Sequence, residues 1–174
     1  MRIEKVETFI VSSFLIAKIT TDDGTEGIGE SCYWAFPRAT QEIIRSFESD
    51  LVGMDPANTE HIWNYLYRKQ SFRGNGLSGA ISAIDIALWD IKGKRLQAPV
   101  WDLLGGRARD RVRAISLDVT GETPEELAAS ARTILHNGFT ALKFIPMRGE
   151  WWLDRYPNFI RACLAQVEAV REAI

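Results

Sequence analysis

Residues 77–94, LSGAISAIDIALWDIKGK, constrain the fold of this chain more than any other segment. Large aliphatic residues recur at the spacing of one helical face, and alanines fill a second face where a neighbouring element can approach closely. The large positions are Ile81, Ile84, Leu88 and Ile91, and the small ones are Ala80, Ala83 and Ala87. A helix that is apolar on almost every side must be covered by other layers, so this segment predicts an internal helix of a larger body.

Two carboxylates, Asp85 and Asp90, interrupt this apolar helix. A buried acid without a partner costs several kcal/mol, so it needs a hydrogen-bond donor or a cation nearby. Two interpretations are open: structural acids that tie the helix to backbone or arginine on adjacent elements, or catalytic acids. We favour the structural interpretation for both.

The composition limits the classes of partner. The chain has 174 residues, 46% of them hydrophobic and 25% charged, which is typical of a globular protein with a sizeable core. A net charge of −2 gives no basic field for nucleic acid or for an anionic membrane. No apolar run approaches the ~20 residues that span a bilayer, and the first residues lack a secretory signal. The two cysteines match no metal-ligand spacing, so we expect free thiols and a cytoplasmic location.

The first part of the chain predicts an α+β domain over residues 1–110. Alternating apolar and polar residues predict strands, and Asp23-Gly24 supplies the positive φ that a tight hairpin demands. Strands are predicted at residues 2–11, 14–21 and 27–30, forming an antiparallel meander. Helices are predicted at residues 38–50, 58–69 and 77–94, with residues 72–76 as a loop before the last of them.

The second part changes to a strand–helix–strand–helix order. Strands are predicted at residues 112–119 and 139–145, and the last helix at 159–174. Between the strands, Thr123-Pro124-Glu125-Glu126 is a strong helix start, and Asn137-Gly138 is a common helix stop. This order predicts that residues 111–174 are the first two β/α units of an incomplete TIM-type barrel, because closure requires eight strands. We therefore expect a longer natural protein or an assembly that depends on a partner.

Four segments of the sequence resemble one family. Residues 83–94 (AIDIALWDIKGK) are followed at 99–106 by PVWDLLGG, and residues 20–30 (TTDDGTEGIGE) and 138–143 (GFTALK) extend the likeness. Together they resemble the mandelate racemase and muconate-lactonizing branch of the enolase superfamily. The resemblance implies an N-terminal capping domain followed by a barrel, in a homo-oligomer. It also implies Mg²⁺-dependent removal of a proton α to a carboxylate, with acidic metal ligands on later barrel strands that these residues do not include.

Lys143 is the candidate catalytic residue. It lies near the C-terminal end of the second predicted barrel strand, where such barrels carry their active sites. The resembled family has a Lys-x-Lys-like motif here, whose first position binds the carboxylate and helps set the acidity of the base. Lys143 matches that position, whereas the second position, often the general base, is Ile145, which cannot accept a proton. The alternative is a lysine that simply extends from a strand end into solvent.

Two loops of the capping domain are candidates for binding substrate. In the resembled family, such loops close over the barrel mouth and help select the substrate. Aromatic side chains can exclude water there, and a loop arginine can pair with a carboxylate through two hydrogen bonds. The candidates are Tyr33, Trp34, Phe36, Arg73 and Asn75. The alternative is that Trp34 and Phe36 pack into the capping domain while Arg73 faces solvent.

The absence of a base at Ile145 favours a lyase, namely an acid-sugar dehydratase in which one base removes the α proton and an acid assists departure of the β-hydroxyl. The predicted substrate is a small acid-sugar-like carboxylate. A racemase or cycloisomerase of the same branch is an alternative, and so is a non-catalytic shortened homologue that serves binding or oligomerisation. We expect the 174-residue chain alone to be inactive, because the implied Mg²⁺ ligands lie outside it.

Overall fold

The computed structural model describes residues 1–31, 33, 35–147, 151–153 and 155–174. The chain divides into two compact units, Met1–Ala108 and Arg109–Ile174.

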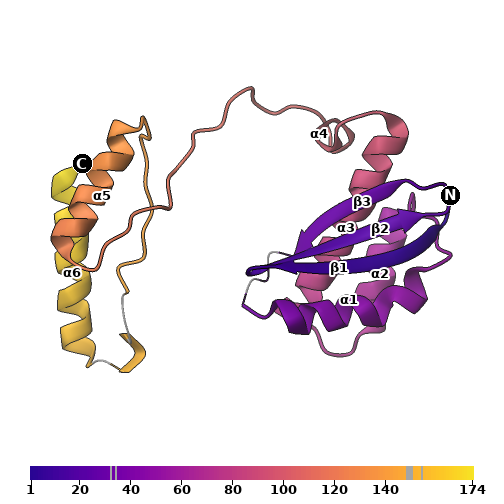
Figure 1. The fold of residues 1–174 in the computed structure, drawn as a ribbon, viewed down its shortest axis with the longest axis horizontal. Coiled ribbons are helices and arrows are strands. Elements are labelled where there is room, and N and C mark those ends of the chain that lie inside the picture. The colour runs from indigo at the N-terminus through magenta and orange to yellow at the C-terminus, as the bar shows by residue number, and fades with distance from the viewer. Residues whose placement is uncertain (32, 34, 148–150, 154) are drawn as a thin grey trace. The chain divides into compact units, whose positions relative to one another are not determined.

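The first unit contains a three-stranded antiparallel sheet in the order β1-β2-β3 (Figure 1). Its strands are β1 (Ile3–Val11), β2 (Phe14–Thr21) and β3 (Glu26–Ser31). The β2–β3 turn places Gly24 at a φ of 82°, a conformation that glycine adopts without steric cost. The predicted meander is therefore confirmed, with strand limits that differ from the predictions by one residue at most.

Helices α1 (Pro37–Leu51), α2 (Thr59–Lys69) and α3 (Asn75–Leu96) complete this unit, together with the short α4 (Val100–Leu103). Helix α3 begins two residues earlier than predicted, because the Ser78 amide already donates to the Gly74 carbonyl at 2.9 Å. Asn75 and Gly76, which were predicted to lie in a loop, therefore form the first turn of the helix. The polar and flexible character of these residues favours a loop locally, but the helical hydrogen bond overrides it.

One core joins the sheet to helices α1, α2 and α3. Its members are buried aliphatic and aromatic side chains that face inward from the strands and from all three helices. Each of those larger than alanine contributes about 1.5–3 kcal/mol by leaving water. The largest include Leu15, Ile19, Phe47, Leu66, Ile84 and Leu88, all less than 2% exposed. The prediction of an internal helix at residues 77–94 is confirmed, although Ile86 remains 44% exposed.

Two glycines let α3 lie directly against β3. A Cβ at Gly27 would collide with the Ala87 carbonyl oxygen and lie 2.6 Å from Ile91 Cγ1. A Cβ at Gly29 would collide with the Ala83 carbonyl oxygen. The backbones of helix and strand are thus in contact, and no larger residue fits at either position.

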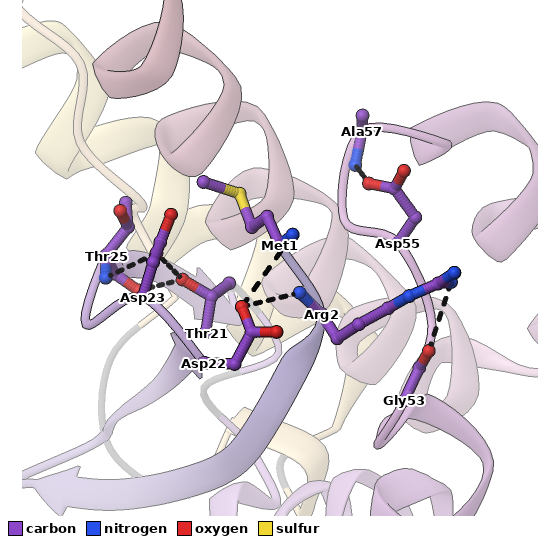
Figure 2. A network of polar contacts seen from close by, with 9 residues as sticks. All are labelled: Met1, Arg2, Thr21, Asp22, Asp23, Thr25, Gly53, Asp55 and Ala57. Carbon is purple, nitrogen blue, oxygen red and sulfur yellow. Dashed lines mark hydrogen bonds and ion pairs between the residues drawn. The ribbon is translucent and has the colours of Figure 1, made fainter.

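A polar network fixes the start of β1 to the β2–β3 turn. Figure 2 shows the Asp22 carboxylate accepting a 2.8 Å hydrogen bond from the Arg2 amide. In the same view the Arg2 guanidinium donates to the Gly53 carbonyl at 3.3 Å. Within the turn, Asp23 accepts from the Thr21 hydroxyl at 2.7 Å and from the Thr25 amide at 3.1 Å. These bonds, the Thr21 hydroxyl first, hold the pKa of Asp23 below its ordinary value.

The second unit contains helix α5 (Pro124–His136), the short 3₁₀ helix η1 (Trp151–Leu153) and helix α6 (Tyr156–Ala173). The start of α5 is a capping box: the Thr123 hydroxyl accepts from the Glu126 amide at 3.2 Å, and the Glu126 carboxylate accepts from the Thr123 amide at 3.2 Å. Backbone N–H groups of Glu122 and Thr123 hold the pKa of Glu126 below its ordinary value. The predicted start is confirmed, and so is the stop, where Gly138 has a φ of 90°.

The two predicted strands of this unit are reduced to one parallel bridge between Ser116 and Leu142. The Ser116 amide donates to the Ala141 carbonyl at 3.1 Å, and the Lys143 amide donates to the Ser116 carbonyl at 2.9 Å. The prediction of full strands at residues 112–119 and 139–145 is therefore wrong within the described chain, although their parallel direction is correct. Parallel strands are stable when both faces are covered, whereas Leu117 and Ile145 are 64% and 57% exposed here.

Replacing Thr123 by alanine is expected to destabilise the first turn of α5 by about 1 kcal/mol, because the Glu126 amide loses its acceptor. Hydrogen exchange should show faster exchange of the Glu126 amide, while amides near the middle of α5 change less. Thr123→Ser is the matched control, since it keeps the hydroxyl. Equal exchange rates in the alanine and serine variants would contradict the capping role.

Candidate active site

The candidate active site is a cavity of about 390 Å³ in the second unit. Its walls come from the two extended segments that meet at the Ser116–Leu142 bridge. They are Leu117, Val119, Lys143, Phe144, Ile145 and Met147. The hydrogen bond from the Lys143 amide to the Ser116 carbonyl fixes the lysine backbone at the wall of this cavity.

Lys143 is the charged residue among these walls, and its neighbours are aliphatic, aromatic or thioether side chains. Lys143, Leu117 and Ile145 are all exposed, so a carboxylate can reach the ammonium group directly from solvent. Ile145 lines the same cavity but offers no proton acceptor. The arrangement can therefore bind and neutralise an anionic group, but its described walls contain no general base beside the lysine.

The first capping loop lies against the start of α3. The rings of Tyr33 and Phe36 are 5.9 Å apart and tilted by 48°. A Cβ added at Gly79 would lie 2.9 Å from the Cβ of Tyr33, and one added at Gly76 would lie 3.8 Å from the Tyr33 ring. Tyr33 therefore packs beside both glycines. Phe36 is 60% exposed, so the alternative that it packs into the capping domain is met only in part. Trp34, the remaining candidate of this loop, lies outside the described residues.

Arg73 belongs to a different cluster. Its guanidinium lies 4.6 Å from the ring centre of Tyr67, and its Nε donates to the Tyr67 carbonyl at 3.4 Å. Tyr67 in turn stacks on Trp63 at 4.9 Å. Among the described residues, no hydrogen bond or ring contact joins Arg73 to Tyr33 or Phe36. Asn75 is exposed at the first position of α3, beside the Gly76 that Tyr33 contacts.

Four residues that line the cavity were not predicted as site residues from the sequence, namely Leu117, Val119, Phe144 and Met147. Leu117, Val119 and Phe144 belong to apolar predicted strands, whose pattern shows no site, whereas Met147 falls in the long loop after residue 145, a kind of loop that is often functional at this end of a barrel. Their proximity to Lys143 depends on the parallel bridge, which no local pattern specifies.

The described residues contain no group of three or more His, Cys, Asp or Glu side chains that could hold a metal ion. Within the same residues, no helix combines the length and the apolar character needed to cross a membrane.

The two acids of α3 have different surroundings. Asp90 accepts from the Ile28 amide at 2.9 Å and pairs with Lys94 at 2.8 Å, which confirms the expected tie to the backbone of an adjacent element. Asp85 has no hydrogen bond or ion pair among the described residues, so the expected tie is absent there. Burial, and secondly the nearby Glu60 carboxylate on α2, raise the pKa of Asp85.

Replacing Asp85 by asparagine is expected to raise the unfolding free energy of the chain at pH 7. Because the pKa of Asp85 is raised in the folded state, that state binds a proton more tightly than the unfolded chain does. Its charge therefore destabilises the fold at neutral pH, and the penalty disappears as the pH falls through the folded pKa toward the ordinary value of 3.8.

Urea unfolding of the parent and of Asp85→Asn between pH 3 and pH 7 measures this difference. The unfolding free energies of the two proteins should converge in acid and separate toward neutral pH. Glu60→Gln is the matched control and should give a smaller gain, since Glu60 is the second cause of the shift. A constant difference across this pH range would contradict the assignment.

Comparison with known proteins identifies the relatives of this chain. Residues 4–105 match the N-terminal domain of the mandelate racemase / muconate lactonizing enzyme family. A D-galactonate dehydratase of Variovorax paradoxus is 37% identical over 176 aligned residues, which cover 100% of this chain and 46% of the relative. The chain thus spans about half the length of the curated relatives it matches.

Solved structures agree with this likeness. A member of the enolase superfamily from Salmonella Typhimurium superimposes with a TM-score of 0.88 at 30% identity, covering 99% of this chain and 51% of that one. An enolase from Pantoea ananatis with bound D-gluconate and Mg gives a TM-score of 0.75 at 32% identity, covering 83% and 36%. The chain belongs to the mandelate racemase / muconate lactonizing enzyme family of the enolase superfamily, and its first unit is the N-terminal capping domain of that family.

Proposed function

We propose that this chain is the N-terminal part of a Mg²⁺-dependent dehydratase that acts on an acid sugar. The likeness to D-galactonate dehydratases over the whole chain carries this proposal. The relative crystallised with D-gluconate and Mg supports the substrate class and the metal. In this proposal residues 1–110 form the capping domain, residues 111–174 form the first two β/α units of a barrel, and the complete protein is a cytoplasmic homo-oligomer.

Lys143 is the residue of this chain that we assign to the reaction. Removal of the proton α to a carboxylate leaves an enediolate, whose negative charge a nearby cation stabilises. The β-hydroxyl then leaves with a proton as water, and the resulting enol becomes a 2-oxo acid. The Lys143 ammonium group, at the wall of its cavity, binds the substrate carboxylate and stabilises this charge.

Ile145 favours a dehydratase over a racemase that uses two bases. It lines the same cavity as Lys143 and cannot remove or return a proton, so one of the two bases that racemisation requires is missing from this wall. The described residues also do not fit a magnesium site, because they hold no cluster of three potential ligands. We assign the ligands of the ion and the general base to residues of the complete protein other than the described ones.

The test is an activity assay of a longer protein, in which this chain is followed by the remaining half that its relatives contain. D-galactonate and D-gluconate are supplied with Mg²⁺, and 2-oxo acid is measured with a carbonyl reagent. We expect 2-oxo acid from one of these sugars, loss of activity with a chelator, and no activity from the 174-residue chain alone. Inversion of the α carbon without 2-oxo acid would contradict the proposal and favour a racemase.

A further inference from the structure

Strand β3 forms one edge of the sheet and would ordinarily offer unpaired backbone groups to another strand. The Ile28 amide points away from β2, since it donates to the Asp90 carboxylate of α3 at 2.9 Å. Backbone groups alternate in direction along a strand, so Glu26 and Glu30 present theirs on the same side. These three residues make up the β3 edge.

Two side chains of α3 occupy the positions that another strand would take. Asp90 accepts from the Ile28 amide, and Lys94 Nζ donates to the Glu26 carbonyl at 2.7 Å. The two side chains also pair with each other at 2.8 Å across one helical turn. They reach the edge because Gly27 and Gly29 bring the helix backbone into contact with β3.

The opposite edge of the sheet, along β1, is also closed by groups of the same unit. The Ile3 amide donates to the Met54 carbonyl at 2.9 Å, and the Ile3 carbonyl accepts from the Gly53 amide at 2.8 Å. Further along, Gln41 Nε2 of α1 donates to the Thr8 carbonyl at 3.5 Å. Closure of the edges is therefore common to both sides of the sheet, but only β3 among the described strands is closed by an ion pair of its packing helix.

We infer that Asp90 and Lys94 close the β3 edge against pairing with β3 of a second copy of this chain. A second copy is the fitting occupant because an antiparallel pair of identical strands is centred on one residue, here Ile28, and exchanges the same backbone groups in both directions. That register sets Glu26 of one copy opposite Glu30 of the other. Like charges directly opposite each other destabilise a strand pair, so these glutamates form a second barrier.

The experiment removes the cover of the Ile28 amide and the repulsion between the glutamates together in the 174-residue chain. Asp90→Ala frees the Ile28 amide, and Glu30→Lys converts the opposed glutamates into opposite charges. Sedimentation velocity should then show concentration-dependent dimers that the parent does not form at the same concentration. Glu30→Lys alone should sediment as the parent, because Asp90 still covers the edge. Asp90→Asn with Glu30→Lys should do the same, because asparagine keeps an acceptor oxygen for Ile28.

A charge reversal tests the register. Adding Glu26→Lys to the associating variant sets lysine opposite lysine and should abolish the dimer. Association that survives this change, or a double variant that sediments as the parent, would overturn the inference. Circular dichroism and thermal unfolding show whether each variant is folded. If Asp90→Ala does not fold, Asp90→Leu with Glu30→Lys makes the same test, since leucine is a strong helix former that also leaves the Ile28 amide without an acceptor.

Discussion

Replacing Gly29 by alanine is expected to lower the unfolding free energy of the first unit by about 3 kcal/mol or more, at the upper end of the cost of overpacking a core. The added Cβ would collide with the Ala83 carbonyl oxygen and lie 2.8 Å from the Ala87 amide nitrogen. Both atoms are helix backbone, so they cannot turn aside as a flexible side chain would. The helix must move away from β3, which disturbs the burial of Ile84, Leu88 and the side chains around them.

Urea unfolding followed by circular dichroism measures this loss as a lower midpoint. Gly74→Ala is the matched control, because Gly74 is extended, with a φ of −167°, and an added Cβ would meet nothing within 4 Å. We expect that control to stay within about 0.5 kcal/mol of the parent. Equal midpoints for Gly29→Ala and the parent would show that the helix does not lie against the strand.

The close contact at Gly27 and Gly29 could not be predicted from the sequence. Glycines near a turn are ordinary, and their local pattern indicates no contact with a distant helix. Their role depends on α3, whose contacting residues Ala83 and Ala87 lie more than fifty positions away. The small face of α3 was visible in the sequence, but the strand that it contacts was not.

The strands of the first unit were predictable because their signals are local. Alternation along β1 and β2 places Leu15, Ala17 and Ile19 on one face, and Asp23-Gly24 fixes the turn that follows. The start of α5 was predictable for the same reason, since the capping box of Thr123 and Glu126 spans four residues. Each of these features is determined by neighbours in the sequence.

The strands of the second unit depend instead on distant partners. Apolar runs at residues 112–119 and 139–145 are typical of strands covered on both faces, and the described chain supplies little cover for them. Lys143 could still be selected from the sequence, because a lysine near a predicted strand end is conspicuous. The apolar residues around it could not be selected in this way, because the bridge between Ser116 and Leu142 is what brings Leu117 and Val119 to Lys143.

Replacing Lys143 by methionine in the complete protein is expected to reduce kcat/KM for the acid sugar by roughly 10²–10³, the usual cost of removing one group that stabilises developing negative charge. Methionine keeps much of the length and apolar surface of lysine but loses the ammonium group that would bind the substrate carboxylate. The Lys143 side chain is exposed, so the unfolding free energy should change little. This prediction rests on the proposed function.

Separate values of kcat and KM distinguish binding from charge stabilisation at Lys143. If the ammonium group only holds the carboxylate, KM rises and kcat is unchanged. If it also stabilises the enediolate, kcat falls as well, because that charge develops only in the transition state. Lys143→Arg keeps the positive charge and should recover part of the loss. The neighbouring Ile145→Val keeps an aliphatic wall and should leave kcat/KM close to the parent's. An unchanged kcat/KM in Lys143→Met would mean that this lysine merely extends into solvent, since a cation in contact with the reacting carboxylate cannot be removed without cost.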